Sequence, residues 1–270
     1  MLQFPNCKIN LGLYITSKRD DGYHDLETIF YPLNCADALE IIRSEKLHFQ
    51  TAGIEIPGDL EQNLILKAYS LLKKMYHQIQ AIDIFLLKKI PLGAGLGGGS
   101  SNAAFMLKML NDFFELKLSK NELENYALQL GSDCPFFIEN KTALAKGRGE
   151  QLWPIELNLS AYHFVIIKPP IHISTSWAFS QIKPCSQRKP LIEIIAQPIN
   201  TWENELVNDF EAPIMKSYPE IAIIKNRLKE CGAVYNSMSG SGSAVFGIFE
   251  ENQDLKKMQA LFPEYFVYVQ

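Results

Sequence analysis

The chain has 270 residues, of which 47% are hydrophobic and 21% are charged, the balance of a folded globular protein. At about 100–200 residues per domain, this length fits one large domain or two ordinary ones and argues against a long repeat array. The 26 Lys and Arg residues face 30 Asp and Glu residues, a net charge of −4. No overall positive field therefore attracts nucleic acid or anionic lipid, and an anionic substrate needs a local binding device.

The N-terminal residues and the cysteines indicate the compartment. No stretch approaches about 20 apolar residues without charge, and residues 1–16 lack a basic start and a small-residue cleavage site. Five cysteines, an odd number without a CxxC pair, favour reduced thiols over a disulfide framework or a zinc site. We expect a cytoplasmic protein that binds neither membrane nor nucleic acid.

The hydrophobic pattern predicts alternating strands and helices along the chain. Strands are predicted at residues 7–15, 38–42, 81–90, 163–167 and 243–249. Helices are predicted at residues 63–77, after the glycines that follow residue 91, and at 119–130, 203–211 and 219–231. Three prolines predict an extended surface loop at residues 184–198. A polar break near residues 153–159 divides the chain into predicted domains at 1–155 and 156–270.

Glycines are concentrated in two short stretches, at residues 93–99 and at 240–242. The first stretch lies between a predicted strand and a helix for which residues 100–102 are suitable N-cap types. Backbone N–H groups at a helix N-terminus bind phosphate, and glycines let the ligand come close. We therefore predict a phosphate-binding loop, with a flexible connection as the less favoured alternative. Its residues are Pro91, Leu92, Gly93, Ala94, Gly95, Leu96, Gly97, Gly98, Gly99, Ser100 and Ser101.

Other glycine-rich phosphate motifs fit this loop less well. A Walker A loop needs Gly-Lys-Ser/Thr, and no lysine lies between Pro91 and Phe105. Residues 93–98 match GxGxxG, but the acidic residue of a dinucleotide site would end a second strand about 20 residues later, where another helix is predicted. A protein kinase needs HRD and DFG elements, and the chain contains neither.

Taken together, several motifs resemble the superfamily of galactokinase, homoserine kinase, mevalonate kinase and phosphomevalonate kinase, the GHMP kinases. The glycine loop resembles the superfamily's Pro-x-Gly-x-Gly-Leu-Gly-x-x-Ser-Ser. The segment Gly-Ser-Asp133-Cys-Pro resembles the one that supplies its catalytic aspartate, and residues 237–243, with Asn208-Asp-Phe-Glu211, resemble its third glycine loop. Lys8-Ile-Asn10 and Asp-Gly-Tyr23-His24 are similar to a signature of the branch whose alcohol substrate carries cytidine diphosphate.

The resemblance implies both fold and activity. It implies an α+β fold of two domains, the N-terminal one similar to ribosomal protein S5 and the C-terminal one ferredoxin-like, with the active site in the cleft between them. It implies that ATP, with Mg²⁺, phosphorylates the 2-hydroxyl of 4-diphosphocytidyl-2-C-methyl-D-erythritol in non-mevalonate isoprenoid synthesis. A monomer or homodimer is expected. A mevalonate- or homoserine-type kinase, a dinucleotide-dependent oxidoreductase and a nucleotide-binding protein without turnover are the alternatives.

The resemblance also implies roles for individual residues. Asp133 would accept the proton of the substrate hydroxyl, and Lys8 would pair with Asp133 and the transferring phosphoryl group. By residue type alone, Asp133 would be a turn residue and Lys8 a strand residue reaching water. The residues expected to bind the cytidyl substrate are Asn10, Tyr23, His24, Thr175 and Phe179.

Two further expectations concern an aromatic residue and two cysteines close to these positions. Trp177 competes with Phe179 as the aromatic residue that stacks on cytosine, and core packing is an equal alternative for each ring. Cys7 and Cys134 adjoin Lys8 and Asp133, so bulky thiol reagents are expected to block activity, although cysteine more often packs as a small hydrophobic residue.

Overall fold

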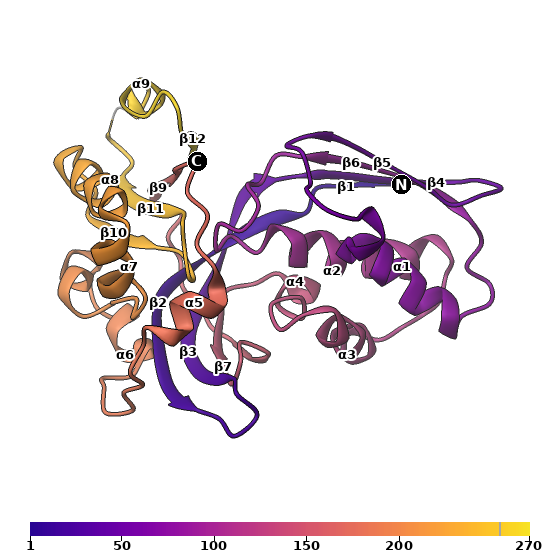
Figure 1. The fold of residues 1–270 in the computed structure, drawn as a ribbon, viewed down its shortest axis with the longest axis horizontal. Coiled ribbons are helices and arrows are strands. Elements are labelled where there is room, and N and C mark those ends of the chain that lie inside the picture. Colours follow the sequence, from indigo (N-terminus) through magenta and orange to yellow (C-terminus); the bar gives the residue numbers. More distant parts are fainter. Residues whose placement is uncertain (254) are drawn as a thin grey trace. The chain divides into compact units, whose positions relative to one another are not determined.

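The computed structural model describes residues 1–253 and 255–270, which form two compact units (Figure 1). Unit 1 comprises Met1–Lys8, Pro32–Leu92 and Gly97–Lys141. Unit 2 comprises Ile9–Tyr31, Gly93–Leu96 and Thr142–Gln270. Both units draw on the first half of the chain, and the domains at 1–155 and 156–270 remain a prediction. No helix of the described residues is long and apolar enough to cross a membrane.

Unit 1 contains a four-stranded sheet. Its strand order is β1 (Leu2–Gln3), β4 (Ala38–Arg43), β6 (Ile82–Lys88) and β5 (His48–Gly53). β4 runs antiparallel to β1 and β6, whereas β5 is parallel to β6. Alternate residues of β6 are buried, which is the period of a strand with one face on the core.

The helices of unit 1 pack together over one face of this sheet (Figure 1). They are the 3-10 helix η1 (Leu60–Gln62), α1 (Leu64–Met75), α2 (Gly98–Phe113), α3 (Lys120–Leu130) and α4 (Phe136–Glu139). α3 begins with a capping box between Ser119 and Glu122, and Gly131 ends it. α2 begins at Gly98 instead of after residues 100–102, because Gly97 takes the left-handed conformation that turns the chain into the helix.

A second sheet is built on two long strands that contribute residues to both units. Its order is β2 (Asn6–Lys18), β3 (His24–Ala36), β7 (Ala143–Lys146) and β8 (Gln151–Pro154). The turn between β2 and β3 is closed by the Arg19 N–H, which donates to the carbonyl oxygen of Tyr23 at 2.8 Å. Gly22 has φ +85° there, a conformation that favours glycine.

Unit 2 also contains an antiparallel sheet, in the order β10 (Tyr235–Met238), β11 (Val245–Glu250), β9 (Tyr162–Lys168) and β12 (Phe266–Val269). Its helices are α5 (Thr175–Ser180), α6 (Leu191–Ile195), the 3-10 helix η2 (Ile199–Asn204), α7 (Glu211–Ser217), α8 (Pro219–Glu230) and α9 (Met258–Leu261). α8 packs on β10 and β11, and its buried Ile221, Ile224 and Leu228 join the core of the unit.

Most predicted elements are confirmed, and two are corrected. The predicted strands correspond to β2, β4, β6, β9 and β11, and the predicted helices at 63–77, 119–130 and 219–231 correspond to α1, α3 and α8. The helix predicted at 203–211 is wrong: η2 ends at Asn204, and Asn208 forms a parallel bridge with Leu13 before α7 begins. The loop predicted at 184–198 contains α6, because Leu191 and Ile194 are buried.

Candidate active site

The two residues predicted to be catalytic form an ion pair within unit 1. The Lys8 ammonium lies 3.4 Å from the Asp133 carboxylate, with 4% of the lysine side chain and 32% of the aspartate side chain exposed. Asp133 lies in the turn between α3 and α4, which is closed by a hydrogen bond from the Cys134 N–H to the carbonyl oxygen of Gly131. The pair thus combines a buried cation with an accessible carboxylate.

The glycine loop packs directly against this pair. A Cβ atom at Gly97 would lie 3.2 Å from Lys8 Cε and 3.0 Å from the ring of Phe137, and Gly97 has φ +69°. Only glycine combines this conformation with this approach. The lysine, the aspartate and the start of α2 therefore form one cluster in unit 1.

The start of α2 offers groups for an anion and a cation. No described side chain caps this helix, so its first N–H groups are available for a ligand. The Ser101 hydroxyl is buried and has no hydrogen-bond partner among the described residues. A hydroxyl in this position fits Mg²⁺ held between protein and phosphate oxygens. In the described part of the chain, no three His, Cys, Asp or Glu residues could hold a metal ion by themselves.

A cavity of about 430 Å³ adjoins the loop in unit 1. Its lining includes Pro57, Asn63, Leu64, Lys88, Gly99 and Asn102. Burial lowers the pKa of Lys88, while the Asp37 carboxylate, its partner in a buried ion pair, counteracts that effect. Sequence reasoning missed Asn63, Lys88 and Asp37 because each lies outside the glycine motif.

The other part of the loop, residues 93–96, is bound by the second glycine stretch within unit 2. The Ser239 hydroxyl donates to the carbonyl oxygen of Gly95 at 2.9 Å, and the Ala244 N–H donates to that of Ala94 at 3.2 Å. A Cβ atom at Gly95 would lie 1.9 Å from the Ser239 carbonyl oxygen. Glycine is therefore obligatory at residue 95.

Two side chains of the motif at 208–211 hold this second stretch in place. The Asn208 amide donates to the carbonyl oxygens of Met238 at 2.7 Å and Gly240 at 2.8 Å. A Glu211 carboxylate oxygen accepts from the Met238 N–H at 2.7 Å. The sequence motif by itself indicates no role for these two side chains, since their partners lie about 30 residues away in sequence.

The residues predicted to bind substrate lie in unit 2 and form separate contacts. His24 stacks on Phe179 with ring centroids 5.0 Å apart and 23° between the planes. Tyr23 is exposed, and the Arg148 guanidinium lies 4.9 Å from its ring centroid. Trp177 instead packs edge-on against Tyr218, at 5.6 Å and 89°. Of the two competing aromatic residues, Phe179 is thus the one beside His24.

The other two predicted substrate-binding residues face the glycine stretch at 237–243. Asn10 is 2% exposed; its amide donates to the Thr28 hydroxyl at 3.0 Å and its side-chain oxygen accepts from the Ser239 hydroxyl at 3.4 Å. The Thr175 and Ser241 hydroxyls are 3.3 Å apart. Asn10 therefore supports this stretch as well as being a candidate contact of the substrate.

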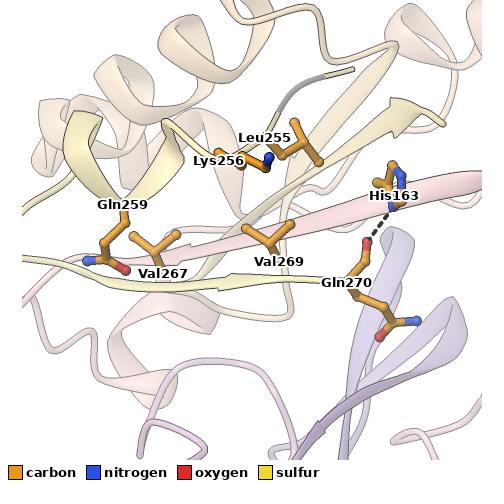
Figure 2. Close-up of a pocket in the computed structure, with 7 residues that line it drawn as sticks. All are labelled: His163, Leu255, Lys256, Gln259, Val267, Val269 and Gln270. Atoms are coloured by element: carbon orange, nitrogen blue, oxygen red, sulfur yellow. Dashed lines mark hydrogen bonds between the residues drawn. The ribbon is translucent and has the colours of Figure 1, made fainter. Parts of the chain in front are cut away.

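A further cavity of about 430 Å³ lies beside β9, β12 and α9 in unit 2 (Figure 2). Its lining includes Val267 and Val269 of β12 and His163 of β9, whose Nδ1 lies 3.1 Å from the carbonyl oxygen of Gln270. None of the predicted site residues lines it, so it is not a part of the candidate site.

Two family models match separate parts of the chain. The family model for the GHMP kinases N terminal domain matches residues 63–141, and that for the GHMP kinases C terminal matches residues 191–267. The chain is 50% identical to the 4-diphosphocytidyl-2-C-methyl-D-erythritol kinase of Bacteroides fragilis over 96% of this chain and 95% of the relative. It is 48% identical to the kinase of that name from Parabacteroides distasonis, over 99% and 98% of the two chains.

Solved structures agree with the predicted α+β, two-domain fold. A crystal structure of 4-(cytidine 5'-diphospho)-2C-methyl-D-erythritol kinase matches with a TM-score of 0.87 at 32% identity, covering 100% of this chain and 98% of that one. The mevalonate kinase of Methanococcus jannaschii matches with a TM-score of 0.72 at 13% identity, covering 100% and 97%. At 13% identity, the similarity to this mevalonate kinase is evidence for the fold alone.

Proposed function

Because this chain belongs to the 4-diphosphocytidyl-2-C-methyl-D-erythritol kinase family of the GHMP kinases, we propose that it phosphorylates the 2-hydroxyl of 4-diphosphocytidyl-2-C-methyl-D-erythritol with ATP. The products are the 2-phosphate and ADP, within non-mevalonate isoprenoid synthesis. The ion pair of Lys8 and Asp133 beside Gly97 is the observation that carries the proposal, because it joins a proton acceptor and a cation to a phosphate-binding helix start.

Asp133 receives the proton of the attacking hydroxyl. As the alcohol oxygen bonds to the γ-phosphorus, the bond from phosphorus to the β-phosphate oxygen breaks and ADP leaves. Phosphoryl transfer depends mainly on positioning and on stabilising the charge of the equatorial oxygens. The Lys8 ammonium supplies that charge and orients the carboxylate, which lies 3.4 Å away.

The glycine loop holds the ATP phosphates. The uncapped N-terminus of α2 directs N–H groups and the positive end of the helix dipole toward them. Mg²⁺, when bound, neutralises phosphate charge, and the unpartnered Ser101 hydroxyl is the group of this loop that would ligate it. The cavity lined by Asn63, Leu64 and Lys88 receives the nucleoside end of ATP.

His24, Phe179 and Tyr23 select the cytidine group. Nucleobases are selected by ring stacking and by hydrogen bonds to the base edge. The exposed Tyr23 offers a ring face, and the His24 imidazole, stacked on Phe179, offers hydrogen-bonding nitrogens beside that ring. Asn10 and Thr175 supply polar contacts to the rest of the substrate.

The test is ADP release by the purified protein with Mg²⁺ and ATP, in the presence and absence of 4-diphosphocytidyl-2-C-methyl-D-erythritol. Homoserine and mevalonate are the control alcohols, and NADH titration tests the oxidoreductase alternative. We expect ADP release that depends on the cytidyl substrate and that stops when the metal is chelated. Turnover with mevalonate or homoserine alone, or ATP binding without product, would overturn the proposal.

A further inference from the structure

Asp37, at the junction of β3 and β4, has four hydrogen-bond donors on one buried carboxylate. Asp37 is only 1% exposed. One oxygen accepts from the backbone N–H groups of Lys89 at 2.7 Å and Ile90 at 2.8 Å. The other accepts from the Asn102 amide at 2.8 Å and from the Lys88 ammonium.

These donors lie on both sides of the glycine loop. Lys88, Lys89 and Ile90 immediately precede Pro91, whereas Asn102 immediately follows Ser101 in the first turns of α2. Lys88 Nζ also lies 3.4 Å from the Asn102 side-chain oxygen. One carboxylate therefore fixes the strand before the loop to the helix after it.

We propose that Asp37 is a positioning residue that holds the glycine loop in the shape that binds the phosphates of ATP. This inference rests on the proposed function of the loop. Five glycines in residues 93–99 make the segment intrinsically flexible, so ordering it around a ligand is unfavourable unless the folded protein has already ordered it. Asp37 provides that order through both ends of the loop, without touching the nucleotide.

The alternative is that Asp37 only neutralises the buried Lys88. Loss of that function would lower the amount of folded protein, and a substitution that keeps the negative charge would avoid this loss and leave both KM values unchanged. Loss of loop order would instead raise KM for ATP and leave KM for the alcohol substrate unchanged. Comparison of the KM values for ATP and for the alcohol substrate therefore distinguishes a positioning role of Asp37 from a purely structural one.

Three variants separate these effects. Asp37→Asn keeps an acceptor for the N–H groups before the loop and replaces the oxygen that binds Lys88 and Asn102. Asn102→Ala removes the link to α2 and retains the ion pair of Asp37 with Lys88. Asp83→Asn is the matched control: it changes a carboxylate on the same strand as Lys88, whose partner, His48 on β5, lies 2.8 Å away.

We expect Asp37→Asn and Asn102→Ala each to raise KM for ATP about tenfold or more, the effect of losing a hydrogen bond to a charged group. KM for the cytidyl substrate stays within about twofold, and Asp83→Asn retains wild-type constants for both. Because Asn102 also lines the cavity, the double variant Asp37→Asn/Asn102→Ala is required. If the two residues act through one shared link, their effects on KM for ATP are less than additive. If Asn102 contacts the nucleotide directly, the effects are additive.

The inference is overturned if folded Asp37→Asn keeps the wild-type KM for ATP, if both KM values rise together, or if the double variant is additive. Should Asp37→Asn fail to fold, Asp37→Glu replaces it in the cycle with Asn102→Ala, because it keeps the charge that neutralises Lys88 and moves the carboxylate by one methylene; a wild-type KM for ATP in this variant then overturns the inference. Calorimetric titration of ATP into wild type and the folded Asp37 variant tests loop order without turnover. Equal ATP affinities would mean that this inference fails. A protein that binds ATP but has no kinase activity would mean that the proposed function fails.

Discussion

The Lys8 ammonium lies 3.4 Å from the Asp133 carboxylate, although one residue belongs to the first long strand and the other to the turn after α3. The lysine is buried and the carboxylate is partly accessible, which suits the roles proposed for them: a fixed charge beside a phosphoryl group and a proton acceptor that an alcohol can reach.

Asp133→Asn should lower kcat by about 10²–10⁴-fold, the contribution of a positioned general base, and leave ATP affinity unchanged. The amide has the size of the carboxylate but cannot accept the proton. Steady-state kinetics and calorimetric ATP titration measure the two effects. Glu139→Gln in α4, which removes a surface ion pair with Lys120, is the control and should keep wild-type kcat. Near-normal turnover by Asp133→Asn would exclude Asp133 as the proton acceptor.

Ser101→Ala should not destabilise the protein, because the hydroxyl it removes is buried without a partner in the described structure. The same change should increase the Mg²⁺ concentration needed for half-maximal activity, since it deletes the proposed ligand. Thermal melting and Mg²⁺ titration of activity test both statements. A lower melting temperature with an unchanged Mg²⁺ requirement would show that the hydroxyl is structural.

Gly95→Ala and Gly99→Ala should differ sharply in stability. A Cβ atom at Gly95 would lie 1.9 Å from the Ser239 carbonyl oxygen, with φ +76°, whereas at Gly99 the nearest atom is 3.9 Å away. We expect Gly95→Ala to destabilise by about 2 kcal/mol or more, because the backbone has to move. Gly99→Ala lies within α2 and should be neutral or stabilising by up to about 1 kcal/mol. Urea unfolding measures both, and equal stabilities would contradict the packing of the two glycine stretches.

Phe179→Ala should raise KM for the cytidyl substrate about 10–100-fold, as expected for the loss of one stacking ring, without changing KM for ATP. Trp177→Ala is the comparison, because Trp177 packs on Tyr218 rather than beside His24. It should reduce thermal stability and leave both KM values near wild type. If Trp177→Ala instead produced the selective rise in KM, the assignment of the stacking residue would be reversed.

Thiol reagents should react first at Cys185 and leave the kinase active. Cys185 is exposed, whereas Cys7 and Cys134 are fully buried. Burial raises the pKa of Cys134 to about 12, so at pH 8 only about one part in 10⁴ is the reactive thiolate. This corrects the expectation that thiols beside Lys8 and Asp133 are targets. Mass mapping after alkylation, together with residual activity, tests it, and rapid inactivation of a Cys185→Ser variant would contradict it.

Local sequence was sufficient wherever a short pattern encodes its own geometry. The strand, glycine stretch and helix around residues 82–113 were predictable because the hydrophobic period and the glycine positions lie in adjacent segments. The capping box at Ser119 and Glu122 was predictable because its donors and acceptors are three residues apart.

Long-range contacts were not predictable in this way. Residues 203–211 have helical spacing, but Asn208 pairs with Leu13 and donates to Met238 and Gly240, which holds the backbone out of a helix. Asp37 belongs to no motif and gains its role only through donors at residues 88–90 and 102.

The sequence by itself therefore determined the family, and it predicted the phosphate-binding loop and the residues proposed for the chemistry, because these depend on spacing within about ten residues. Only the tertiary structure decided that Phe179 rather than Trp177 lies beside His24, and that Asp37 connects both ends of the loop. The physical reason is that each of these contacts joins side chains from separate elements, and packing, not local propensity, determines which distant side chains meet.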